Sequence, residues 1–118
     1  MSVLLDSNIL IDHLRDVPAA TETIRRHRHV SVSVISRIEV LAGPAAQVED
    51  ARLLLSTMQV LPLTEAVADK AVEMRRELRL RLPDAVILAT AKVHRLTLVT
   101  RDQRDFGGLV DVDVPYRL

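Results

Sequence analysis

The sequence contains no cysteine and very few aromatic residues. Phe, Trp and Tyr together make up 2% of its 118 residues. Without cysteine, the protein has no disulfide, no thiolate nucleophile and no cysteine-ligated zinc site. With so few aromatic rings, the core must consist mainly of Leu, Val, Ile and Ala, and the bases of a nucleic acid strand cannot be held mainly by stacking.

An excess of charge of either sign is also absent, since 16 basic residues balance 16 acidic ones. No overall basic field attracts nucleic acid, so any contact with RNA must be local. The longest unbroken apolar run, Ala85 to Ala89, is far shorter than the roughly 18 residues that cross a bilayer. The amino terminus lacks the basic and apolar pattern of a secretory signal. We therefore expect a soluble, cytoplasmic protein that does not associate with membranes.

The length fits a single domain spanning residues 1–118, because independent domains most often contain roughly 100 to 150 residues. Strands are expected at Val3–Leu5, Val30–Val34, Val60–Leu63 and Leu96–Val99, with a further edge strand at Val110–Val114. Helices are expected to include Ile9–Leu14, Ala19–Arg28, Ile35–Ala42, Ala46–Met58, Glu65–Arg81 and Asp84–His94, and a polar loop is expected at Thr100–Asp105. This alternation predicts an α/β domain with a largely parallel central sheet and helices on both faces.

Four acidic residues stand where a core or a strand end is expected. Asp6 and Asp102 follow strands, Asp84 opens the most apolar helix, and Glu39 lies at the edge of an apolar helical face. Each has a purely structural alternative: a helix cap for Asp6, an ion pair for Glu39, a favourable helix dipole for Asp84 and a turn for Asp102. The carboxyl ends of parallel strands lie near one another, so these acids can converge. Converging carboxylates would favour a hard cation such as Mg²⁺ or Mn²⁺.

Several motifs, in order and spacing, resemble those of the PIN-domain ribonucleases, and among them the VapC-type toxins of bacterial toxin-antitoxin pairs. The resemblance covers Val3 to Phe106 and rests on Leu4-Leu5-Asp6-Ser7-Asn8, Glu39 with Gly43, Leu82-Pro83-Asp84-Ala85, Leu98-Val99-Thr100-Arg101-Asp102 and Asp105-Phe106. It implies a metal-dependent endoribonuclease in which metal-activated water hydrolyses a phosphodiester bond.

The resemblance also implies which residues form the site. Asp6, Glu39, Asp84 and Asp102 would be the catalytic acids that hold one or two Mg²⁺ or Mn²⁺ ions, with Asp105 a further metal ligand. The side chains of Asn8 and Thr100 would line the pocket as polar supports. Expected partners are an RNA substrate, a cognate antitoxin protein and a second copy of the chain in a homodimer.

Other interpretations remain open at the level of sequence. A noncatalytic RNA- or protein-binding module on the same fold has no physical need for four clustered acids, and a stand-alone RNA-processing nuclease would share the same site. A haloacid-dehalogenase-like phosphatase would need a second acid where Asn8 stands, and a receiver domain would need a lysine after a late strand. The run Arg75, Arg76, Arg79 and Arg81 either contacts RNA phosphates or a partner, or is a solvated helix face.

Overall fold

The computed structural model describes residues 2–118 and contains one sheet whose strands are all parallel. The strand order is β3-β2-β1-β4-β5, so the first strand of the chain lies at the centre. The strands are β1 (Val3–Leu5), β2 (Val30–Ser33), β3 (Gln59–Leu61), β4 (Thr97–Val99) and β5 (Val112–Asp113). The prediction of an α/β fold with a parallel central sheet is confirmed.

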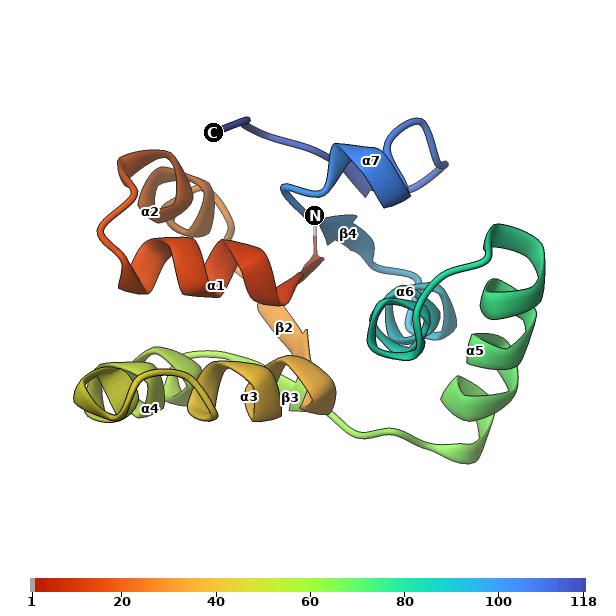
Figure 1. Ribbon diagram of the computed structural model, residues 1–118, viewed down its shortest axis with the longest axis horizontal. Helices are drawn as coiled ribbons and strands as arrows, with labels where there is room; N and C mark the ends of the chain where they lie inside the picture. The colour runs from red at the N-terminus through yellow and green to blue at the C-terminus, as the bar shows by residue number, and fades with distance from the viewer. Residues whose placement is uncertain (1) are drawn as a thin grey trace.

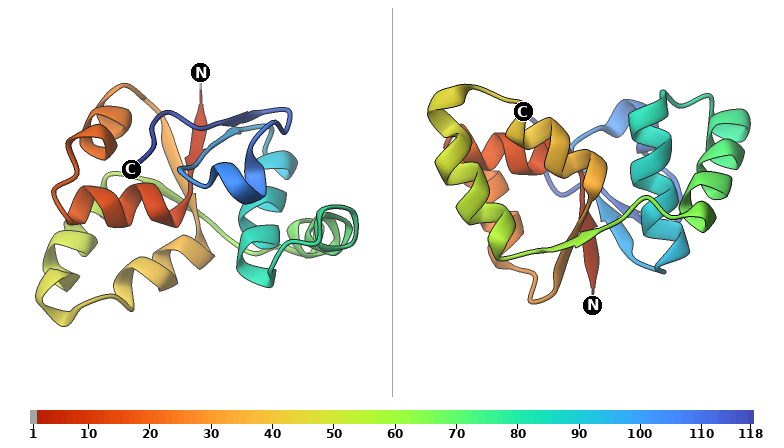
Figure 2. Two further views of the ribbon diagram at one scale, coloured as in Figure 1. Left: turned by 45° about the horizontal axis from the view of Figure 1, so that its top comes forward. Right: turned by 90° about the horizontal axis from the view of Figure 1, so that it is seen from below.

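Helices cover both faces of this sheet, as Figure 1 and the turned views of Figure 2 show. One face carries α1 (Ser7–Leu14), α2 (Pro18–Arg25), α3 (Val34–Leu41), the short 3-10 helix η1 (Ala45–Gln47) and α4 (Val48–Ser56). The other face carries α5 (Glu65–Leu78) and α6 (Leu82–Val93), and the short helix α7 (Gln103–Phe106) follows β4. None of the helices in residues 2–118 combines the length and apolar character needed to cross a membrane.

The central strand divides the interior into two hydrophobic clusters. Successive side chains of a strand point to opposite faces. Accordingly, Val3 and Leu5 pack in the cluster beneath α1, α3 and α4, whereas Leu4 packs in the cluster beneath α5 and α6. The α6 helix is buried from Ala85 to Ala91, as its nearly all-apolar sequence predicts. It therefore holds its first turn firmly beside the carboxyl edge of the sheet.

The structure corrects three predicted elements. The predicted helix Ala46–Met58 is divided into η1 (Ala45–Gln47) and α4 (Val48–Ser56). The segment predicted as a loop at Thr100–Asp105 contains the first three residues of α7, because the Asp102 side chain caps this helix and Phe106, its last residue, is fully buried against the α6 side of the core. The predicted helix Glu65–Arg81 ends at Leu78, since Arg79 adopts a left-handed conformation with φ of 55°. A left-handed residue at this position is a common way to end a helix.

Candidate active site

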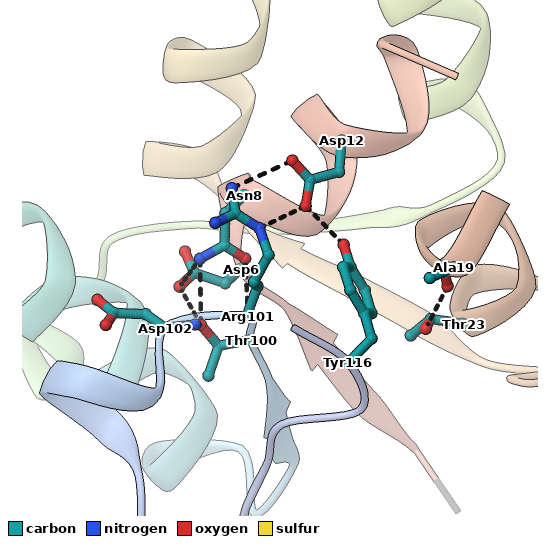
Figure 3. Close-up of polar contacts among 9 residues, drawn as sticks. All are labelled: Asp6, Asn8, Asp12, Ala19, Thr23, Thr100, Arg101, Asp102 and Tyr116. Atoms are coloured by element: carbon teal, nitrogen blue, oxygen red, sulfur yellow. Dashed lines mark hydrogen bonds and ion pairs between the residues drawn. The ribbon is translucent and has the colours of Figure 1, made fainter. Parts of the chain in front are cut away.

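The site begins where β1 and β4 end side by side. Leu5 pairs with Val99, and the backbone N–H of Asp6 donates to the carbonyl oxygen of Val99 at 2.9 Å. The next residues of the two strands, Asp6 and Thr100, are therefore brought together. The Thr100 hydroxyl donates to Oδ2 of Asp6 at 2.8 Å, and Figure 3 shows this contact at the centre of the polar network.

Asp6 is buried, with 4% of its surface exposed, and it also caps α1. Its Oδ1 accepts from the backbone N–H of Ser7 at 2.7 Å. Burial raises the pKa of Asp6 to about 6; the hydrogen bonds from Thr100 and Ser7 oppose the rise, while the negative charges of Asp84 and Glu39 add to it. The cap alternative considered for Asp6 is therefore present in the structure, together with the proximity to other acids.

Three further acids lie beside one another at this edge. Asp84 is in the first turn of α6, Asp102 caps α7, and Asp105 is in the first turn of α7. Each offers a carboxylate oxygen, and these oxygens all lie within 4.8 Å of one another. The structure thus brings both Asp102 and Asp105 to Asp84, and we call these three residues the aspartate triad.

Asp84 holds an oxygen that lacks a normal partner. Its Oδ2 is buried and accepts no hydrogen bond from residues 2–118. Arg81 Nη2 lies 3.6 Å away, an ion-pair distance too long for a hydrogen bond, and the Arg81 side chain is 82% exposed, so it compensates little. Burial raises the pKa of Asp84, Arg81 lowers it, and the nearby charges of Asp102, Asp105 and Glu39 raise it further.

Glu39 reaches the same neighbourhood from α3. Its Oε1 accepts a hydrogen bond of 2.6 Å from the Ser7 hydroxyl, which also contacts the Ser36 hydroxyl at 2.9 Å. In the structure of residues 2–118 this carboxylate makes no salt bridge to arginine, which was its structural alternative. Glu39 is exposed, yet its charge acts on both Asp6 and Asp84.

The polar residues Asn8 and Thr100 lie between the two segments that carry acids. Asn8 Nδ2 contacts Thr100 Oγ1 at 3.3 Å, and its Oδ1 accepts from the backbone N–H of Arg101 at 3.1 Å. Thr100 Oγ1 also accepts from the backbone N–H of Asp102 at 3.0 Å. Both side chains therefore tie the end of β4 to the start of α1.

Sequence reasoning missed several polar residues around the site: Ser7, Ser36, Asp12, Arg101 as a side chain, and Tyr116. For Asp12 a signal was present, because it stands four residues after Asn8 and so on the same side of α1. No local pattern could connect it with Tyr116, which is 104 residues away. That contact depends on the path of the chain after β5.

The residues present fit a divalent cation. Carboxylate oxygens are the donors that Mg²⁺ and Mn²⁺ prefer, and among residues 2–118 the aspartate triad forms an ion pair only with the exposed Arg81. The buried Oδ2 of Asp84, which accepts no hydrogen bond from residues 2–118, is the kind of atom that a bound ion would satisfy. Fold and site together define an α/β protein with an acidic, oxygen-only cluster at the carboxyl edge of a parallel sheet.

Comparison with known proteins identifies the family. The family model described as PIN domain matches residues 3–109. Ribonuclease VapC10 of Mycobacterium tuberculosis is 36% identical to this chain, over 97% of this chain and 92% of its own length. Ribonuclease VapC19 of the same organism is 30% identical, over 96% of this chain and 98% of its own length. The chain therefore belongs to the PIN-domain family and, within it, to the VapC-type proteins.

Solved structures agree with this assignment. A toxin-antitoxin complex from Klebsiella pneumoniae contains a chain that matches with a TM-score of 0.94 at 37% identity, covering 98% of this chain and 99% of that chain. A chain of FitAcB from Neisseria gonorrhoeae matches with a TM-score of 0.78 at 26% identity, covering 100% of both chains. The similarity extends over the whole fold.

Proposed function

We propose that the protein is a divalent-metal-dependent endoribonuclease and the toxin of a toxin-antitoxin pair. The observation that carries the proposal is the convergence of the aspartate triad with Asp6 and Glu39 at one edge of the sheet. The names of the similar proteins, a ribonuclease in one case and a toxin-antitoxin complex in another, support the same activity and the same biological pairing.

In this proposal, Asp84, Asp102 and Asp105 are the main metal ligands, and Asp6, directly after β1, and Glu39 on α3 complete the acidic site. When bound, Mg²⁺ or Mn²⁺ supplies Lewis-acid chemistry for phosphodiester hydrolysis, by lowering the pKa of a water and neutralising charge on phosphate oxygens. No side-chain nucleophile is needed. Both one ion and two are compatible with this set of acids.

The remaining polar groups orient these acids. Thr100 donates to Asp6 Oδ2 and Ser7 donates its backbone N–H to Oδ1, so the Asp6 carboxylate is held in one direction. The Ser7 hydroxyl holds the carboxylate of Glu39, which reaches the site from α3. Because Asp6 is buried, its negative charge is costly until a cation shares the site. The chain therefore favours cation binding at this edge.

The first experiment is cleavage of total cellular RNA by protein freed of any copurified partner, with Mg²⁺, Mn²⁺ or EDTA. The wild type should give discrete fragments only with metal, and Asp84→Asn should abolish them while keeping the fold. Asp69→Asn, which makes the same change on the exposed surface of α5, is the matched control and should cleave normally. An Asp84→Asn protein as active as the wild type would overturn the assignment of Asp84.

The same proposal includes a cognate antitoxin protein, a homodimer and a cytoplasmic location. The Klebsiella pneumoniae structure, described as a toxin-antitoxin complex, provides the basis for the antitoxin. Light scattering of the purified chain, alone and after coexpression with the protein encoded beside it, should give the mass of a dimer and then of a larger complex. A monomer under both conditions would contradict this part.

A further inference from the structure

A buried carboxylate outside the acidic cluster is tied to it by a network of strong contacts. Asp12 lies on α1 with 2% of its surface exposed. Arg101 grips it with two donors, Nε to Oδ2 at 2.5 Å and Nη2 to Oδ1 at 3.1 Å. The Tyr116 hydroxyl donates to Oδ2 at 2.7 Å, and Figure 3 shows Asp12 between these two side chains.

These contacts are the last of three successive sets of hydrogen bonds that join residues 100 and 101 to α1 and its cap. At its start, Asp6 accepts from the Thr100 hydroxyl; at Asn8, the side chain accepts from the backbone N–H of Arg101. One turn further, at Asp12, the side chain accepts from the Arg101 guanidinium. Residues 100 and 101 are therefore fastened to α1 at three successive levels, by a hydroxyl, a backbone amide and a side chain.

The fastened segment leads directly into the aspartate triad. The backbone N–H of Asp102 donates to Thr100 Oγ1, and Asp102 Oδ1 then accepts from the backbone N–H of Asp105. A rotation of the backbone at Arg101 would move both carboxylates away from Asp84. The direction of this turn thus decides whether the triad forms.

Tyr116 adds a tie from the end of the chain. Past β5, the chain returns over the α1 side of the sheet, where Figure 1 shows its terminus. Tyr116 packs against the hydrophobic cluster of that face and places its hydroxyl on Asp12. Both oxygens of Asp12 are thereby occupied. Because Asp12 is buried and both its oxygens have partners, its carboxylate is held in one orientation.

We propose that Asp12, held by Tyr116, is a positioning residue that orients the Thr100–Asp105 turn through Arg101 and so brings Asp102 and Asp105 to the metal site. The inference rests on the proposed metal-dependent function. Replacing a side chain that hydrogen-bonds to and orients metal ligands commonly lowers the metal affinity by about 10- to 100-fold.

The test compares Asp12→Asn and Tyr116→Phe with Thr23→Val. Tyr116→Phe removes only a hydroxyl, so this variant should fold. It therefore tests the proposal even if Asp12→Asn proves to be unfolded. Thr23→Val is the matched control, because it removes a hydroxyl that is likewise bonded at 2.7 Å, to the carbonyl oxygen of Ala19, on α2 away from the site. Two quantities are measured: amide hydrogen exchange in protein kept in EDTA, and the Kd for Mn²⁺ by calorimetry.

We expect faster exchange at residues 101–105 in both site variants and a Kd for Mn²⁺ that rises about tenfold, with neither change in Thr23→Val. Exchange and Kd in both site variants equal to those of Thr23→Val would overturn the positioning role. The failure of the proposed function has a different signature. In that case wild-type protein would bind no Mn²⁺ and cut no RNA, whereas faster exchange in EDTA would still report whether Asp12 and Tyr116 orient the turn.

Discussion

Asp6 serves as a helix cap and as part of the acidic site, and these uses set opposite demands on its charge. The start of α1 favours the negatively charged form of the Asp6 cap. Burial and the nearby charges of Asp84 and Glu39 disfavour that charged form. Burial prevails, because the pKa of Asp6 is raised from 3.8 to about 6. The charge of this one carboxylate therefore makes the metal-free fold sensitive to pH.

The sensitivity predicts a loss of stability as pH rises. Between about pH 4 and 6 the unfolded chain loses the Asp6 proton while the folded protein keeps it, so the free energy of unfolding falls across this window. The contribution is about 3 kcal/mol at most. Urea unfolding in EDTA should show a larger fall in the wild type than in Asp6→Asn, in which only the raised pKa of Asp84 still contributes; parallel pH profiles for the two proteins would contradict the prediction.

Metal binding should depend on pH in the opposite direction. A carboxylate must lose its proton to hold a cation, so the affinity for Mn²⁺ should fall as pH drops through about 6. Calorimetric titrations from pH 5 to 8 would measure the change. An affinity that stays constant from pH 7 to 5 would show that Asp6 does not share the metal.

The sequence alone indicates where most acidic residues of the candidate site lie. Asp6 and Asp102 follow apolar strands, and Asp84 lies in the first turn of a strongly apolar helix, so their positions could be predicted from parallel-sheet geometry. The role of Asp12 could not be predicted, because its partners Arg101 and Tyr116 are distant in sequence.

Among the elements, α7 depends most on tertiary contacts. With 4 residues it is too short to be stable alone, and the Asp102 cap and the buried Phe106 ring contribute to holding it. This explains why a polar sequence that predicts a loop forms a helical turn. Other boundaries follow from local signals, as with the Thr64 cap that begins α5 and Pro83 in the first turn of α6.

Phe106→Leu should loosen α7 by leaving part of the ring's space empty. We expect the free energy of unfolding to fall by about 1 to 3 kcal/mol and the Kd for Mn²⁺ to rise, since Asp102 and Asp105 are carried by this turn. Urea unfolding and calorimetry measure the two effects. A destabilised variant with unchanged Mn²⁺ affinity would contradict the prediction, because it would show that metal binding does not depend on the packing of α7.

The exposed arginines at the end of α5 predict a local contact with RNA. Arg76 and Arg79 are exposed shortly before Asp84, in a protein without net charge. Reversing both to Glu should weaken binding to RNA by the uncleaving Asp84→Asn protein and flatten its dependence on salt. The control reverses exposed Arg25 on α2. Equal affinity for RNA with and without the charge reversals would contradict the prediction and show that these arginines only contact solvent.

For the molecule as a whole, the alternation of apolar segments was enough to predict the parallel sheet and its covering helices. The order β3-β2-β1-β4-β5 was not predicted, because strand order depends on how crossover helices pack and not on any single segment. This order puts β1 in the middle, beside both β2 and β4. Leu5 and Val99 consequently end together and bring Asp6 to Thr100.

The two hydrophobic clusters predict additive effects. Val40 lies in the cluster under α3, and Val67 lies in the cluster under α5. Val40→Ala and Val67→Ala should each destabilise the protein by about 2 kcal/mol, since each removes two buried methyl groups. The double variant should equal their sum within about 0.5 kcal/mol in urea unfolding. A larger deviation would mean that the sheet transmits packing changes between its faces.

The separation of the two faces by β1 has an evolutionary consequence. Residues in the cluster under α1 to α4 contact different side chains from residues in the cluster under α5 and α6. The sequence of one cluster can therefore change while selection conserves the other. Descendants of one ancestral chain could thus acquire new surfaces on one side without compensating changes on the other. Epistasis should instead concentrate at the carboxyl edge, where residues from both layers meet around the same few oxygens.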